Sequence, residues 1–290
     1  MKNSLITTGN GFDLDLGWKT SYEDFYQAKK DEFAEWNRMQ YIKDMVQGEY
    51  WFNLEGYIRK SLIEMPQERV QEMNIFWMFC CSRLLEYFNP RTDDQYNNIF
   101  NTNKESCAYK FLKSVTEKSS IVTFNYTDPF AQNNIPVKAR EYIHIHGDIT
   151  KAVRFTDIKL GADKSVIDQN SIAKDDSILP IIKSYENKYI EKFSQLLKSH
   201  KNIIFYGHSL AQADADYFKP YFKHVISKDI SGQNIYLVTK NASSLQQIKD
   251  NLKQYQIEYD DILFSKCNVI PVYTEEGINS KDFQQLIKIL

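Results

Sequence analysis

The sequence predicts an α/β fold in which a mostly parallel sheet carries helices on both of its faces. Short apolar, β-branched runs recur along the chain, and most of them end in a glycine or polar turn. Between these runs lie longer stretches whose apolar residues have helical spacing. Strands that alternate with helices are typical of parallel sheets, because each parallel connection has to cross over the sheet. The expected strands cover residues 4–8, 120–124, 141–146, 202–206, 234–238 and 268–272.

The connections between these strands differ in length and character. Residues 22–118 form an aromatic-rich block with helical spacing, which predicts a helical insertion after the first strand within a single domain over residues 1–290. Residues 150–177 are polar and weakly patterned, which predicts a loop or lid. The remaining helices are expected at about 179–199, 242–255 and 280–289.

The composition excludes several classes of protein. With 42% hydrophobic and 26% charged residues, the chain is globular rather than disordered. The net charge is −2 and lysines are spread along the chain, so the sequence has no strong basic cluster of the kind that binds nucleic acid or an anionic membrane. No apolar stretch approaches the roughly 18 residues of a membrane helix, and the N-terminus lacks a signal-peptide layout. We therefore expect a cytoplasmic protein with no membrane partner.

The four cysteines are expected to be buried thiols. Cys80 and Cys81 are adjacent, and neither they nor Cys107 and Cys267 form a C-x-x-C motif. This spacing does not suit a tetrahedral zinc site.

Glycines and polar side chains follow four of the six expected strands. Because the carboxyl ends of parallel strands meet at one edge of a sheet, these residues should converge on one crevice. The segments are Gly9-Asn10-Gly11-Phe12-Asp13, Asn125-Tyr126-Thr127-Asp128, His146-Gly147-Asp148 and Gly207-His208-Ser209-Leu210.

Each of these segments has a functional and a purely structural interpretation. Gly9 and Gly11 would let backbone N–H groups approach a phosphate, or they form only a tight turn. Gly207 opens either a second phosphate or ribose cradle or a plain strand-to-helix turn. Asn125 could bond a sugar hydroxyl or a water, or stabilise the turn before Pro129.

The histidines raise the question of a metal. His144 and His146 lie two apart in an expected strand, so both should point to the same face, as a metal pair or as one catalytic and one structural imidazole. A metal site would have to recruit His208, Asp214 and Asp216. The signatures of dinuclear phosphoesterases are missing in the required order, and so is H-E-x-x-H. No metal is expected, and His144 is interpreted as a core residue.

Taken in order, these segments resemble the bacteriophage abortive infection AbiH family, which is itself similar to sirtuin-like NAD-binding domains. The resemblance implies a Rossmann-like, sirtuin-like fold. The matching segments are Gly9 to Leu14 with Gly17, Thr20, Tyr22 and Asp24-Phe25; Trp51 to Glu55; Thr123 to Thr127; His144 to Gly147; and Gly207 to Leu210 with Asp214, Asp216 and Tyr217-Phe218.

The resemblance also implies roles for single residues. Asn125 would contact the nicotinamide ribose, and His146 would act as the base. Tyr26 stands where the sirtuin-like loop has an arginine, and the four-cysteine zinc module of sirtuin deacylases is missing, so peptide deacylation is not implied. The implied cofactor-binding residues are Gly9, Asn10, Gly11, Phe12, Asp13, Asp24, Phe25, Gly207, His208 and Ser209.

The activity implied by the resemblance is NAD hydrolysis to nicotinamide and ADP-ribose in anti-phage abortive infection. A constitutive NADase would poison its host, so we expect an oligomer whose activity is gated by assembly, a protein partner or a phage trigger. One alternative is a sensor or scaffold that binds NAD or ADP-ribose without cleaving it. The other is a metal-dependent phosphohydrolase or nuclease that uses His144, His146, His208, Asp214 and Asp216.

The segment Trp51 to Glu55 matches the family, but the residues alone suggest no role for it. It could pack a helix and expose Glu55 to solvent, cap the nicotinamide pocket, or form an interface.

Overall fold

Six strands form one sheet in the order β3-β2-β1-β4-β5-β6, and every neighbouring pair is parallel. The computed structural model describes residues 4–34, 53–64, 66, 69–90, 92–152, 154–169 and 176–290. This strand order is that of Rossmann-like folds, whose two halves wind away from the central pair in opposite directions. The predicted fold class is confirmed. The strands are β1 (Ser4–Thr8), β2 (Ser119–Thr123), β3 (Glu141–His144), β4 (Asn202–Tyr206), β5 (Asn234–Thr239) and β6 (Asn268–Tyr273).

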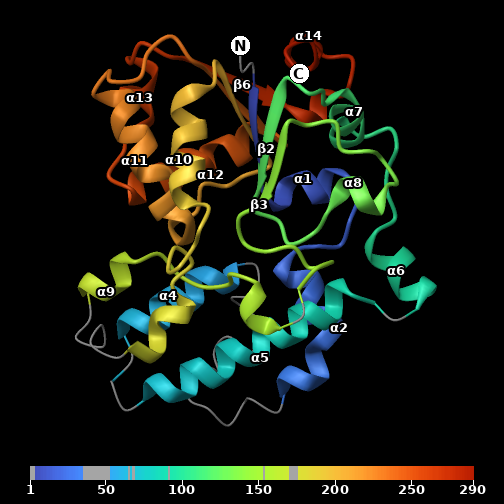
Figure 1. The fold of residues 1–290 in the computed structure, drawn as a ribbon, viewed down its shortest axis with the longest axis vertical. Coiled ribbons are helices and arrows are strands. Elements are labelled where there is room, and N and C mark those ends of the chain that lie inside the picture. Colours follow the sequence, from blue (N-terminus) through green and yellow to red (C-terminus); the bar gives the residue numbers. More distant parts are fainter. Residues whose placement is uncertain are drawn as a thin grey trace.

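Helices cover both faces of the sheet (Figure 1). Because successive side chains of a strand point to opposite faces, Leu5 and Ile6 of β1 enter different apolar clusters. On one face lie α1 (Asn10–Asp15), α7 (Cys107–Ser114), α8 (Pro129–Gln132) and α14 (Lys281–Ile287); on the other lie α10 (Ile190–Ser199), α11 (Ala215–Ile226), α12 (Ala242–Gln254) and α13 (Tyr259–Leu263).

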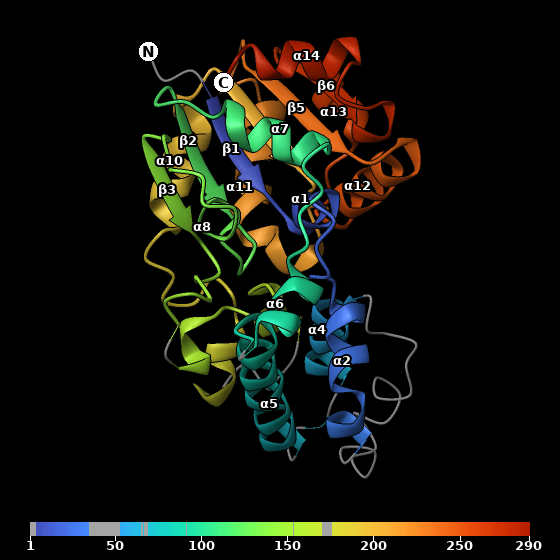
Figure 2. The ribbon, with the colours of Figure 1, turned by 90° about the vertical axis from the view of Figure 1, so that its right-hand side faces the viewer.

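A helical lobe lies below the carboxyl ends of the strands (Figure 2). Its helices are α2 (Tyr22–Ala34), α4 (Leu54–Glu64), α5 (Val70–Phe88) and α6 (Asp93–Ile99), after which α7 returns to the sheet. The expected loop or lid contributes three short elements to the same region, η5 (Phe155–Asp157), α9 (Ser165–Gln169) and η7 (Asp176–Ile181).

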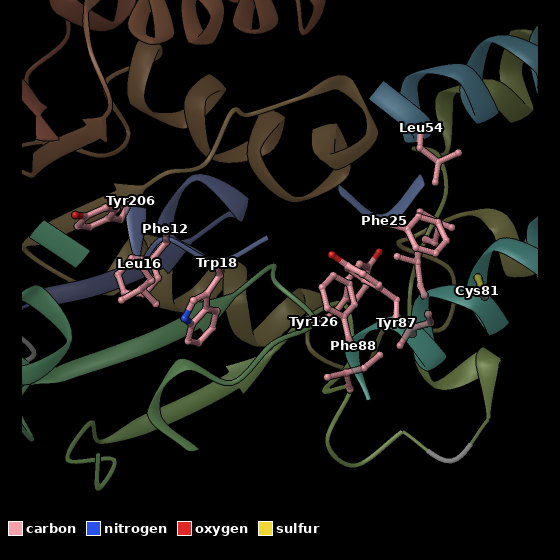
Figure 3. Packing of buried hydrophobic residues seen from close by; sticks show 14 of the residues in the cluster. Phe12, Leu16, Trp18, Phe25, Leu54, Cys81, Tyr87, Phe88, Tyr126 and Tyr206 are labelled. Carbon is pink, nitrogen blue, oxygen red and sulfur yellow. The ribbon is translucent and has the colours of Figure 1, made fainter. Parts of the chain in front are cut away.

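One apolar cluster joins the sheet to this lobe. It contains Phe12 beside the sheet and Phe25 and Leu54 in the lobe, all with at most 1% exposure (Figure 3). The Trp77 indole of α5 donates to the Leu160 carbonyl at 2.7 Å. The inserted helices therefore share a core with the sheet and do not pack as an isolated bundle.

The four cysteines are buried and free, as expected. In the part of the chain that the structure describes, no helix has the length and apolar character needed to cross a membrane.

Candidate functional site

A cavity of about 780 Å³ lies at the carboxyl edge of the sheet. The loops after β1, β2 and β4 form one wall, and Tyr22, Glu55 and Phe88 of the helical lobe contribute to another. The cavity extends past Lys240 to residues of α12, the helix that follows β5. Open parallel sheets bind ligands at this point, where the strand order reverses between β1 and β4.

Most of the residues singled out from the sequence meet in this cavity. Of the twelve residues with an implied catalytic or cofactor-binding role, nine line it: Gly9, Asn10, Gly11, Asp13, Asn125, His146, Gly207, His208 and Ser209.

Phe12, Asp24 and Phe25 do not line the cavity, and each has a structural role elsewhere. Phe12 packs edge-on against the Tyr206 ring at 4.9 Å between ring centroids. The Asp24 carboxylate accepts from the Ser21 backbone N–H at 3.2 Å, and the Ser21 hydroxyl accepts from the Asp24 N–H, in a reciprocal capping arrangement at the start of α2. Phe25 is fully buried in the core of the lobe.

The glycines bring two loops into direct backbone contact. A Cβ atom on Gly11 would lie 2.8 Å from Gly207 Cα, and one on Gly207 would lie 2.1 Å from the Phe12 nitrogen. The N–H groups of Gly9 and Gly11 donate to the carbonyls of Tyr206 and Gly207 at 3.0 and 2.8 Å. Phosphate contacts from these loops would therefore have to use other amides.

The backbone N–H groups of Asn10, His208 and Ser209 suit that role. Among the described residues, none of them donates a hydrogen bond to the protein. All three residues line the cavity. Unsatisfied backbone donors at a ligand-binding edge are suited to an anion.

Replacing Gly207 by Ala is expected to cost at least about 2 kcal/mol of unfolding free energy, because left-handed backbone strain and a backbone clash add. Gly207 has φ +61° and no room for a Cβ. Gly232→Ala is the matched control, since Gly232 has φ +70° but only the flexible end of the Lys201 side chain within 4 Å of a Cβ, at 3.6 Å. Denaturant unfolding of both variants checks this, and equal losses would contradict the proposed loop contact.

The side-chain amide of Asn125 has a fixed orientation. Its Nδ2 donates to the Gly9 carbonyl at 3.1 Å and to Asp13 Oδ1 at 2.7 Å. The other Asp13 oxygen accepts from the Thr127 hydroxyl. Since both amide hydrogens are used, Asn125 Oδ1 is the atom that remains to accept a hydrogen bond from a ligand or a water in the cavity.

Burial raises the pKa of Asp13 to about 7, although hydrogen bonds from Thr127 and Asn125 oppose the shift. In the unfolded chain the pKa is near 3.8. A raised pKa in the folded state contributes stability that is fully present below pH 4 and is lost as the pH rises through 7.

Wild type should therefore lose stability relative to the Asp13→Asn variant as the pH rises. The difference in their unfolding free energies should change by up to about 4 kcal/mol from pH 4 to pH 7 and then level off. Subtracting the wild-type curve removes the contribution of the buried histidines, which also titrate in this range. A difference that does not change with pH would refute the assignment to Asp13.

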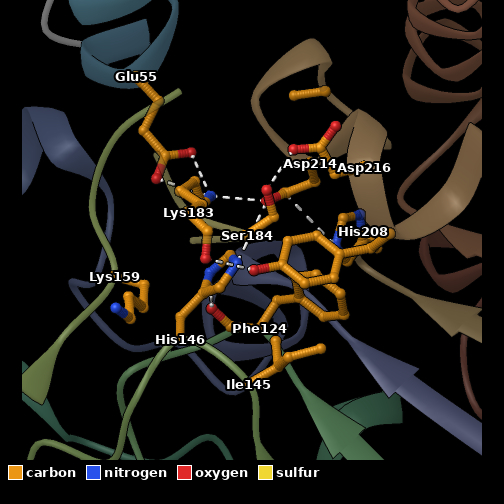
Figure 4. Close-up of polar contacts among 12 residues, drawn as sticks. Glu55, Phe124, Ile145, His146, Lys159, Lys183, Ser184, His208, Asp214 and Asp216 are labelled. Atoms are coloured by element: carbon orange, nitrogen blue, oxygen red, sulfur yellow. Dashed lines mark hydrogen bonds and ion pairs between the residues drawn. The ribbon is translucent and has the colours of Figure 1, made fainter. Parts of the chain in front are cut away.

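A chain of buried charges connects the helical lobe to the sheet (Figure 4). Glu55 of α4 accepts from Lys183 Nζ at 2.8 and 2.9 Å. The same ammonium lies 2.6 Å from Asp214 Oδ1, which in turn lies 3.3 Å from His146 Nε2. The Lys183 side chain is only 1% exposed, so each carboxylate compensates part of the cost of burying its charge.

His146 is held through one ring nitrogen and faces a carboxylate with the other. Its Nδ1 lies 3.1 Å from the Phe124 carbonyl, which can only accept, so Nδ1 carries a proton. Burial lowers the pKa of His146, Lys183 lowers it further and Asp214 opposes both. Burial by itself would raise the pKa of Asp214, but Lys183 and His146 hold it well below its usual range. The result is a neutral imidazole whose Nε2 faces a carboxylate that stays ionised.

His208 has a mainly structural environment. Its Nδ1 accepts from the Leu210 N–H at 3.0 Å, and its ring packs between Phe124 and Phe218. Burial lowers the pKa of His208 to about 4. It is therefore a neutral side chain that supports the loop after β4.

Only three of the five residues of the alternative metal site come together: His146 Nε2 and His208 Nε2 lie 3.3 and 3.8 Å from the two carboxylate oxygens of Asp214. β3 ends at His144, and His146 lies two residues beyond it. His144 lies near Asp148, whereas His146 contacts Asp214. The Asp216 carboxylate accepts from the Lys164 N–H and the Ser184 hydroxyl.

Neither Lys183 nor the role of Glu55 was predicted from the sequence. Of the alternatives for the segment Trp51 to Glu55, exposure of Glu55 to solvent is wrong, because its side chain is 14% exposed and paired with Lys183. Its place in a family-matched segment was the available signal, whereas Lys183 has no motif around it. Trp51 and Phe52 of that segment lie outside the described residues.

Comparison with known proteins identifies the family. The family model for bacteriophage abortive infection AbiH matches residues 5–238, which include β1 to β5 and the residues of the charge chain. None of the curated proteins gives a significant match. The chain therefore belongs to the AbiH family of bacteriophage abortive infection proteins.

Proposed function

We propose that this protein acts in abortive infection by hydrolysing NAD to nicotinamide and ADP-ribose. The observation that carries the proposal is that the Asn125 amide and the His146–Asp214 pair meet in one cavity at the carboxyl edge of the sheet. Its volume of about 780 Å³ lies in the range of cofactor sites. The loops after β1 and β4 line the same cavity, and there the backbone N–H groups of Asn10, His208 and Ser209 would bind the phosphates.

The charge of the site favours a cation near His146. Glu55 and Asp214 carry two negative charges and Lys183 one positive charge, which leaves one negative charge in excess while His146 is neutral. The nicotinamide ring of NAD is a pyridinium, and the ribose becomes an oxocarbenium-like cation as the bond to it breaks. A fixed negative charge in a buried site stabilises such a cation more than water does.

The reaction needs positioning and one base. The bond between the ribose C1′ and the pyridinium nitrogen breaks, nicotinamide leaves neutral and a water oxygen bonds to C1′. Asn125 Oδ1 accepts a hydrogen bond from the water or a ribose hydroxyl and orients it. His146 Nε2 takes the proton from the water, and the imidazolium then donates to Asp214.

The test is to incubate purified protein with NAD and resolve the products by chromatography. Asn125→Ala and His146→Ala are each expected to slow nicotinamide release by roughly 10² to 10⁴-fold, the range for a lost base or orienting group. His224→Ala is the matched control, because His224 is exposed and paired with Asp229 outside the cavity. Turnover that is unchanged in both cavity variants would refute the proposed roles.

One observation favours a second function, binding of NAD or ADP-ribose without cleavage. His146 Nδ1 is held by the Phe124 carbonyl, and Nε2, the atom that would act as base, faces the Asp214 carboxylate at 3.3 Å in a side chain that is only 3% exposed. Calorimetry with NAD, followed by recovery of the ligand, separates the two functions. Tight binding with intact NAD recovered would favour a sensor or scaffold.

We also propose that an NADase of this kind is gated by assembly, a protein partner or a phage trigger, since unregulated turnover would deplete the host. Specific activity is then expected to rise with protein concentration or on addition of the activator. Full activity of a dilute monomer would contradict gating.

A further inference from the structure

We infer that Asp128, His144 and Asp148 form a binding site for one divalent transition-metal ion, separate from the cavity. One ligand atom from each residue lies within 4.8 Å of the other two. None of the three residues lines the cavity. The site lies at the β2–β3 side of the sheet, where Asp128 begins α8 and Asp148 follows the end of β3.

His144 is the observation that points to a ligand. Its side chain is only 8% exposed, and neither ring nitrogen makes a hydrogen bond of normal geometry to any described residue. A buried polar ring without a partner is costly, and such a group calls for an explanation. Its Nε2 lies 3.9 Å from Asp148 Oδ2, too far for a hydrogen bond. A cation between the two atoms would give the imidazole nitrogen a partner.

Asp128 keeps one oxygen that can face such a cation, and Asp148 has one that is held only by an exposed lysine. Asp128 Oδ1 accepts from the backbone N–H groups of Phe130 and Ala131 and from the Tyr142 hydroxyl, and no described residue donates to Oδ2. Asp148 Oδ1 accepts from Thr150, whereas Oδ2 pairs with Lys151 Nζ at 2.6 Å. The Lys151 side chain is 77% exposed, so its ammonium can move into solvent.

The donor set defines the class of ion. One imidazole nitrogen and two carboxylate oxygens suit Zn²⁺ or Mn²⁺, with water in the remaining positions. Two ligand atoms about 2.1 Å from one ion lie roughly 3 to 4.2 Å apart, so the 3.9 Å separation of His144 Nε2 and Asp148 Oδ2 fits a shared ion. The ion would balance the negative charge of the two carboxylates. It would also link the end of β3, two residues before His146, to the start of α8.

Binding of Zn²⁺ by calorimetry and of Mn²⁺ by electron paramagnetic resonance tests the site on the full chain. Asp128→Asn, Asp148→Asn and His144→Ala are each expected to weaken binding at least about 10-fold, since each removes one of three protein ligands. Asparagine is as good an N-cap as aspartate, so Asp128→Asn keeps the start of α8. Lys151→Met removes the competing ammonium and is expected to bind the ion more tightly than wild type.

His224→Ala is the control for binding to an exposed imidazole, and it should bind as wild type does. The proposal is overturned if wild type binds neither ion up to millimolar concentration. It is also overturned if Asp128→Asn and His144→Ala bind as tightly as wild type, or if Lys151→Met does not bind more tightly. Thermal unfolding without metal, measured for every variant, shows that each protein is folded. None of these readouts depends on NAD turnover.

Discussion

Replacing Asp214 by Asn is expected to lower NAD turnover by roughly 10² to 10³-fold, comparable to the loss of a charged group that stabilises the transition state. The asparagine keeps the shape of the side chain but removes the carboxylate that lies 3.3 Å from His146 Nε2. The imidazolium formed during the reaction then loses its compensating charge. Steady-state kinetics of NAD hydrolysis gives the effect on kcat.

The pH profile separates this role from a purely structural one. Asp214 raises the pKa of His146 against the effect of burial, so its removal should move the acidic limb of the kcat profile to lower pH. NAD affinity measured by calorimetry should change only a few-fold. A lower kcat with an unshifted acidic limb would assign Asp214 to the support of the fold alone.

Replacing Lys183 by Met is expected to lower the unfolding free energy by about 3–5 kcal/mol, the cost of breaking a buried ion pair. Methionine fills a similar volume but leaves Glu55 and Asp214 without the ammonium that lies 2.8 and 2.6 Å from them. Equilibrium unfolding in urea at pH 7 measures the loss. The prediction depends on packing and charge alone and holds whether or not the protein cleaves NAD.

An exposed pair provides the matched control. Lys192 lies 3.4 Å from Glu141 with a side chain 49% exposed, so Lys192→Met should change the unfolding free energy by no more than about 0.5 kcal/mol. Adding Glu55→Gln to Lys183→Met removes one of the unpaired charges and should recover part of the loss. Equal effects of Lys183→Met and Lys192→Met would rule out the buried charge chain.

The sequence predicts the sheet well because local patterns carry most of the information. All six strands lie within a residue or two of their expected positions, since short β-branched runs that end in glycine or asparagine are visible without tertiary context. The largest difference is at β3, which ends at His144 rather than at His146. Its neighbour β2 ends at Thr123, whose carbonyl accepts from the Ile145 N–H, so His146 lies beyond the ladder, and alternation alone does not reveal that limit.

The candidate site is predictable only where its residues directly follow strands. Asn125, His146 and the glycine loops are placed at the cavity by topology alone. Glu55 and Lys183 come from helical and irregular segments 128 positions apart, and only the packed fold brings them together. Phe12 and Phe25 show the opposite failure, because they adjoin motif residues in sequence but point into apolar cores.

The contact between the two glycine loops bears on how sequence variation in the family should be interpreted. Gly11 and Gly207 each occupy the space that a Cβ on the other would need. A Cβ on Gly9 would collide with the backbone of His208. Selection for a correctly folded sheet edge is therefore enough to conserve Gly9, Gly11 and Gly207. Where a relative differs at one of these positions, the others are expected to differ as well. Invariance of these positions across relatives would carry little information about the ligand, whereas variation at Asn10, Asn125 or Lys240 would track it.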